Sequence, residues 1–206
     1  MADEAPSPKT PPAPQSEIKT SYQNLNNVQA DRVIVQHGSA GDIDANSVLV
    51  SQAGANNITA QTVELRQAGA QSVQATSVTV RQGGVLQAST ENLTLTQGGV
   101  VFSETQHANL TASTAGAILA GGNVQLDQSM ARAVLTRGDV HIDQGGSGVV
   151  LGRTVRTGDN SGTVLMIAGR VNGNVNAVFG PASSAAFGAG FALVLAFLMW
   201  LRRRFG

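Results

Sequence analysis

Apolar residues recur in pairs at a fixed spacing through the middle of the chain. Each pair has the form apolar-x-apolar, and the next pair follows one constant step later. The first six pairs are Val33 and Val35, Val48 and Val50, Val63 and Leu65, Val78 and Val80, Leu93 and Leu95, and Ala108 and Leu110, a 15-residue step each time. The step then lengthens by one at Val124-x-Leu126 and Val140-x-Ile142. Such a period is typical of repeat proteins, in which each unit buries its apolar face against the next.

Within each repeat, apolar and polar positions alternate with a period of two. This alternation predicts strands, since amphipathic helices would show spacings of three and four. A coil of about 15 residues divides into three short sides: in residues 63–77, Val63 and Leu65 fill one side, Ala70 the second, and Val73 and Ala75 the third. We therefore predict an all-β fold, a single-stranded three-sided β-solenoid whose coils stack about 4.8 Å apart.

A further column stands two residues after each apolar pair. It holds glutamine at most positions, with His37 and Ala112 at the others; the glutamines are Gln52, Gln67, Gln82, Gln97, Gln128 and Gln144. Because the column shares the alternation of the apolar pair, we expect it to point to the same side. We predict an amide ladder at a corner, each glutamine bonded to the one above and below. A row of solvated surface glutamines is the alternative, and both interpretations are structural.

Proline divides the chain into regions. Residues 1–20 hold five of the six prolines and predict a disordered tail. Residues 21–178 form the predicted solenoid, in which the absence of proline suits a continuous ladder, because proline lacks a backbone N–H. Strand-like segments continue after Gly145, so we expect nine to eleven coils.

Residues 179–206 differ in character from the repeat. Residues 182–201 are an uncharged, mainly apolar run that would span about 30 Å as a helix, the thickness of a bilayer core. Trp200 stands where an interfacial aromatic residue would, and Arg202, Arg203 and Arg204 follow it closely. We predict one transmembrane helix with a basic tail; a buried core helix is the alternative.

Small residues recur four apart in the first half of this predicted helix, as in Ser184 with Gly188 and Ala186 with Gly190. This spacing lets helix backbones approach closely in lipid. The sequence therefore predicts that Ser184, Gly188 and Gly190 form an interface between membrane helices; the alternative is that the small residues only ease insertion of a monomeric anchor.

Composition excludes several classes of function. Net charge is zero and aromatic residues make up only 4% of the chain, so nucleic-acid binding has no support. The chain has no cysteine, which removes disulfides and thiolate metal sites. We expect no cofactor, no metal and no small-molecule substrate.

Three histidines are the remaining candidates for chemistry. His37 replaces a glutamine in the column, and His107 and His141 should face outward. His141 and Asp143 share one face of a strand, but a metal or acid–base site would need further groups nearby. Hexapeptide acyltransferases are also solenoids and would use His141 as a base, but their hexad spacing and long protruding loop are not evident. We expect that the protein is not an enzyme.

Residues 165–177, LMIAGRVNGNVNA, resemble the coils of bactofilins, the polymer-forming bacterial cytoskeletal proteins. Their coils carry repeated Val/Ile-x-Gly-x-Val/Ile phrases of this kind. The layout is similar too, with a proline-containing tail, a compact β-helix and association with membrane. The resemblance implies a right-handed three-sided β-helix that assembles end to end without nucleotide.

Two functions fit these features. One is a membrane-anchored structural or scaffold protein whose solenoid self-associates or polymerises; the other is a surface-displayed stalk or adhesin held by its C-terminal helix. The arginine cluster favours the cytoplasm for the tail and so the outside for the solenoid. The absence of a recognisable secretory signal favours the inside. We expect a single-pass cell-membrane protein with the solenoid on the cytoplasmic side, and with the lipid bilayer and further copies of itself as partners.

Overall fold

The computed structural model describes residues 16–22, 24–173 and 176–177. These residues form an all-β parallel solenoid of about ten turns. The strands are β1 (Glu17–Ser21), β2 (Asn24–Gln36), β3 (Ser39–Ser51), β4 (Gly54–Arg66), β5 (Gly69–Arg81), β6 (Gly84–Thr96), β7 (Gly99–Thr111), β8 (Thr114–Ala120), β9 (Val124–Asp127), β10 (Met130–Thr136), β11 (Asp139–Asp143), β12 (Gly146–Thr157), β13 (Gly162–Gly173) and β14 (Asn176–Ala177). The chain divides into two compact units, residues 1–102 and 103–206, and β7 crosses the boundary.

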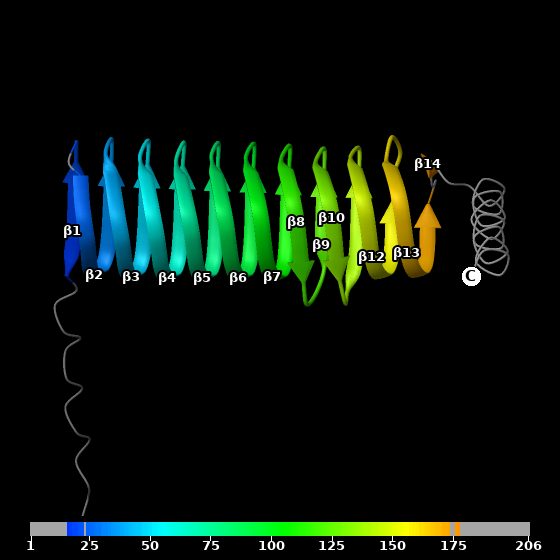
Figure 1. Ribbon diagram of the computed structural model, residues 1–206, viewed down its shortest axis with the longest axis horizontal. Coiled ribbons are helices and arrows are strands. Elements are labelled where there is room, and N and C mark those ends of the chain that lie inside the picture. Colours follow the sequence, from blue (N-terminus) through cyan, green and yellow to red (C-terminus); the bar gives the residue numbers. More distant parts are fainter. Residues whose placement is uncertain (1–15, 23, 174–175, 178–206) are drawn as a thin grey trace, which may run out of the picture. The chain divides into compact units, whose positions relative to one another are not determined.

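In the first unit, long strands follow one another in parallel order from β2 to β6 (Figure 1). Their register is offset by one full repeat, so that Val48 pairs with Val63 and Val63 with Val78. Like residues therefore lie over like residues, as the repeat predicted. The predicted strands and the 15-residue period are confirmed.

Burial within one coil follows a mixed pattern of steps. Inward side chains stand two residues apart along a side, as in Val63 and Leu65, and three apart across a corner, as from Leu65 to Ala68. The inward positions of one full coil are Ala55, Ile58, Ala60, Val63, Leu65 and Ala68. A step of three places two consecutive residues on the outside, which bends the chain. Three such bends in each coil leave room for only small and medium side chains inside.

The second unit keeps parallel pairing, but at most positions its register is longer by one residue. Val124 pairs with Val140, and Leu135 pairs with both Leu119 and Leu151. The extra residue lies where β8 is separated from β9 and β10 from β11, and Figure 1 shows longer loops at these places. Strands β12 and β13 contain the strand-like segments predicted after Gly145.

The start of the solenoid differs from the prediction. Strand β1 begins at Glu17, so the last residues assigned to the tail belong to the fold. Ile18 pairs with Val33 and Thr20 with Val35, so one more coil precedes β2 at the same 15-residue spacing. The boundary drawn at residue 20 followed proline content, whereas the last proline of the tail is Pro14.

The predicted membrane helix, residues 182–201, lies outside the described residues, together with Ser184, Gly188, Gly190, Trp200 and the three arginines. Within the part of the chain that is described, no helix is long and apolar enough to cross a bilayer.

Candidate functional site

One corner of each coil is made by a residue other than glycine in the left-handed backbone conformation. The φ angles are 51° at Gln52, 49° at Gln67, 55° at Gln82 and 54° at Gln97. This conformation costs a residue with a Cβ roughly 1–2 kcal/mol, and it is usually given to glycine or asparagine. A glutamine repeated at this position therefore indicates that its side chain contributes something a glycine would not.

The side chains of these glutamines form the predicted ladder. Gln52 Nε2 donates to Gln67 Oε1 at 2.9 Å, Gln67 Nε2 to Gln82 Oε1 at 3.1 Å, and Gln82 Nε2 to Gln97 Oε1 at 3.1 Å. In the second unit Gln128 Nε2 donates to Gln144 Oε1 at 3.4 Å.

The direction expected for the ladder is wrong, because its side chains are exposed rather than on the inward side of the Val pair. The positive φ breaks the strand alternation at the corner and turns the amide outward. We call this row the glutamine corner.

The glutamine corner extends beyond the residues that the sequence analysis identified. Tyr22, with a φ of 60°, stands one coil before His37, and Asn160, with a φ of 58°, stands one coil after Gln144. The Tyr22 and His37 rings stack with centroids 4.7 Å apart and planes 10° apart. Extending the repeat spacing of 15 or 16 residues in both directions would have located both residues.

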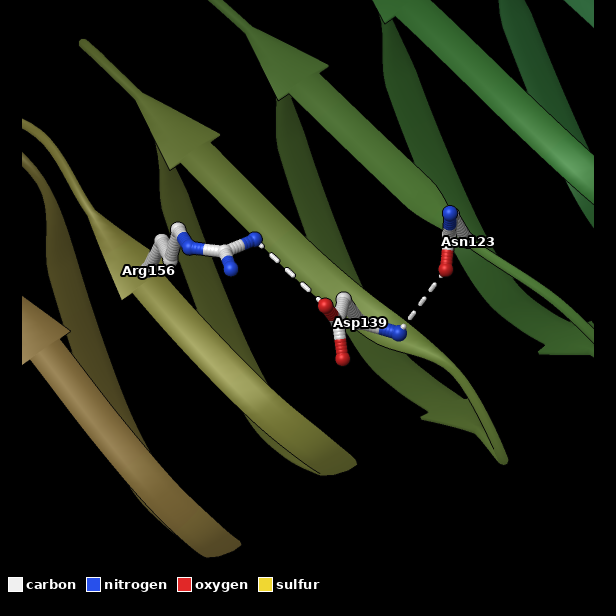
Figure 2. Close-up of polar contacts among 3 residues, drawn as sticks. All are labelled: Asn123, Asp139 and Arg156. Atoms are coloured by element: carbon white, nitrogen blue, oxygen red, sulfur yellow. Dashed lines mark hydrogen bonds and ion pairs between the residues drawn. The ribbon is translucent and has the colours of Figure 1, made fainter.

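A second polar ladder in the second unit runs from Asn123, directly before β9, to β11 and β12 (Figure 2). Asp139 holds its centre: its backbone N–H donates to Asn123 Oδ1 at 3.0 Å, and its carboxylate accepts from Arg156 Nη1 at 3.4 Å. The Asn123 N–H in turn donates to His107 Nδ1 at 3.3 Å. Both ionic side chains are substantially exposed, so this ladder fixes a loop corner more than it adds to stability.

His141 and Asp143 share one outer face of β11, as predicted. His141 is exposed, and its pairing neighbours are Gln125 and Arg156, while Asp143 pairs with Asp127. Among the described residues no group of three or more His, Cys, Asp or Glu side chains could hold a metal ion. The pair therefore gains no third ligand from the neighbouring coils.

A groove of about 410 Å³ lies on the first unit, between the corners of β2, β3 and β4. Its polar rim contains Asp42, Asp44 and Asn57, and buried Ile43 lies beneath. Asn57 Nδ2 donates to Asp42 Oδ1 at 2.7 Å, which repeats the ladder arrangement of the glutamine corner. The Asp42 carboxylate on the rim of the groove thus already accepts a hydrogen bond from a neighbouring side chain.

One outward repeat position changes character between the units. In the first unit it holds polar residues: Gln29, Asp44, Thr59, Gln74 and Ser89. In the second unit it holds Glu104 on β7 and then four aliphatic residues, Leu119, Leu135, Leu151 and Ile167, which pair in sequence and are 38%, 37%, 40% and 54% exposed. We call these four residues the leucine column. These four residues were not predicted, because the predicted columns included only inward positions, although their regular spacing is visible in the sequence.

These features define a class of protein: a parallel β-solenoid. Its polar side chains form hydrogen-bonded ladders on the outer surface. No model of a protein family, no curated protein and no solved structure matches the chain. Of the residues that resemble bactofilin coils, 165–173 lie in β13 and 176–177 form β14. The relationship to that family stays a prediction.

Proposed function

We propose that the protein is a membrane-anchored structural protein, a scaffold whose solenoid self-associates. Its partners are the lipid bilayer and further copies of the same chain. It is not an enzyme, and its work is done by assembly and position rather than by chemistry.

The observation that carries this proposal is the strand β1 at the start of the solenoid. It pairs in parallel with β2 along one edge, and no described strand pairs with its other edge. The same coil exposes Ile18 to 36%, although Ile18 occupies an inward position beside Val33. An unpaired strand edge with apolar side chains behind it pairs with another chain unless it is covered.

The membrane part of the proposal rests on the sequence. Residues 182–201 are long and apolar enough to span a bilayer, and three arginines follow them. The proposal that the solenoid polymerises is likewise supported by the sequence, through the resemblance of residues 165–177 to bactofilin coils.

A surface-displayed stalk or adhesin is the second candidate, and the arginine cluster favours it. Arginines next to a membrane helix are retained in the cytoplasm, which would leave the solenoid outside. Both functions use the same fold, and the side of the membrane on which the solenoid lies distinguishes them.

The chain contains no cysteine, so single-cysteine variants report one position each. Gln74→Cys introduces a thiol at an exposed position in the first unit. We expect an impermeant maleimide to label it only after intact cells are lysed, as a cytoplasmic solenoid requires. Labelling in intact cells would refute the cytoplasmic scaffold and support the surface-displayed stalk.

Self-association is tested on the purified full chain in mild detergent. Lys19→Cys places a thiol on exposed β1, and Gln74→Cys is the control on the side of the solenoid. We expect sedimentation to show oligomers that a bismaleimide traps through residue 19 and not through residue 74. A chain that sediments as a monomer at every concentration would refute the scaffold.

A further inference from the structure

We propose that the leucine column lies against the lipid bilayer, so that one side of the second unit is a membrane-contacting surface. This inference deepens the proposed function and rests on the membrane anchor that it includes. The partner is a lipid bilayer: its apolar interior would contact the leucine column, and its anionic headgroups would border that contact.

The leucine column is built from the outward positions of four paired strands. On β10, Leu135 stands between the buried Val134 and Thr136, so its side chain must point away from the interior. A sheet face that meets water normally carries polar residues at such positions, as the first unit does. Four aliphatic residues in register depart from that rule over three steps of about 4.8 Å.

A neighbouring outward column widens the apolar surface. Ala117, Ala133, Val149 and Leu165 pair in order beside the leucine column, with Val149 38% and Leu165 46% exposed. Exposure is greatest on β13, the last long strand before the predicted anchor. Together the two columns expose six aliphatic side chains to 37–54%, which amounts to roughly a few hundred Å² of apolar surface, and contiguous apolar patches above that size on a soluble monomer usually mark an interaction site.

Charge around the patch is mainly positive, although exposed Glu104 on β7 stands one repeat before Leu119. Exposed Arg132 and Arg137 stand on either side of Leu135, and exposed Arg153 follows Leu151 by two residues. The strands β8, β10, β12 and β13 contain no Asp or Glu. Within the described part of the second unit, the ion pair found is that of Arg156, which leaves these three arginines available to headgroups. Apolar side chains bordered by cations are the signature of a surface that lies in the lipid interface.

Patch size and charge favour the bilayer over a second copy of the chain. A stable protein dimer buries about 800 Å² on each partner, which this patch does not reach. Pairing two such faces would also bring like-charged arginines together.

The predicted anchor makes a weak lipid contact sufficient. The five Cα–Cα steps from Ala177 to Ala182 span at most about 18 Å, so the last coil stays close to the membrane. A tethered surface acts at high effective concentration.

The test uses the full chain in vesicles of phosphatidylcholine with a minority of phosphatidylglycerol. Ala133→Cys carries an environment-sensitive fluorophore beside the leucine column, which stays intact. Gln125→Cys, exposed on β9, is the matched control on another side of the same unit. We expect a blue-shifted emission at residue 133 that loses about half its intensity to a lipid-borne quencher, with little effect at residue 125. Leu135→Ser with Leu151→Ser should abolish the quenching at residue 133.

Each other outcome overturns the inference in a distinguishable way. A chain that does not float with the vesicles would refute the anchor and so the proposed function. A chain that floats, with residue 133 open to aqueous iodide, would refute only the membrane contact. Shielding from both quenchers that grows with protein concentration would assign the patch to a second copy. Shielding that is independent of concentration would assign it to another part of the same chain.

Discussion

The inward register of the solenoid can be tested at one pair of adjacent residues, Val78 and Thr79. Val78 is fully buried and pairs with Val63 on one side and Leu93 on the other. Thr79 points outward between Glu64 and Thr94. An aspartate at residue 78 should therefore destabilise the fold strongly, and an aspartate at residue 79 should not.

The size of the effect follows from burial. Replacing Val78 removes a buried side chain worth about 1.5–3 kcal/mol. The new carboxyl group would lie between two aliphatic neighbours that offer no hydrogen-bond donor, which costs several kcal/mol more. A total of roughly 4–8 kcal/mol is comparable with the whole stability of many domains, about 5–15 kcal/mol. For a chain of this length it corresponds to a fall in Tm of roughly 10–30 °C.

The outward variant, Thr79→Asp, should lose much less stability than Val78→Asp. Thr79→Asp puts a carboxylate next to Glu64, a repulsion of up to about 1 kcal/mol on one face of a sheet. Glu64 also accepts from Arg66 Nε at 2.8 Å, and this hydrogen bond raises the pKa of Arg66 above its ordinary value. Thr79→Asn removes the charge and separates repulsion from any loss of packing.

The assay is thermal unfolding of the full chain by far-ultraviolet circular dichroism, with all variants in the same detergent. We expect Val78→Asp to lose most of its strand signal well below the parent Tm, while both variants of Thr79 stay within a few degrees of it. Equal falls in Tm for the aspartate variants of residues 78 and 79 would mean that the inward register is wrong. A small fall in Tm at residue 78 would mean that water reaches the inward column.

Three further predictions concern single residues. Gln67→Ala should lower stability by about 1 kcal/mol, because it breaks two amide bonds and keeps the left-handed corner, whereas Gln67→Gly should be close to neutral because relief of the backbone offsets the lost bonds; unfolding by urea measures both. Gly83→Ala should be strongly destabilising, since its Cβ would collide with the backbone oxygen of Ala68, and Gly54→Ala, which meets open space, is the control in the same Tm assay. Ser103→Ala should raise the free energy of unfolding by roughly 1 kcal/mol, because the buried Ser103 hydroxyl has no hydrogen-bond partner among the described residues, and a lower value in the same urea experiment would contradict this.

The sequence by itself determined the strands, their parallel stacking and the inward columns. This was possible because a coil that repeats at a nearly constant length places like residues over one another, so a one-dimensional spacing becomes a spatial column. Val63, Val78 and Leu93 were identified in this way, and so were the partners within the glutamine ladder. No long-range information was needed, because each coil contacts only its neighbours.

Only the tertiary structure decided the direction of side chains at corners and the role of each glycine. Alternation placed Gln67 on the inward side, but its left-handed φ turns the amide outward. Gly54 begins a glycine column that is periodic in the sequence, yet it has free space around it, while Gly83 is held against a neighbouring backbone. The physical reason is the same for both: a corner is set by backbone dihedrals and by the close approach of the next coil, and residue type alone reports neither of them.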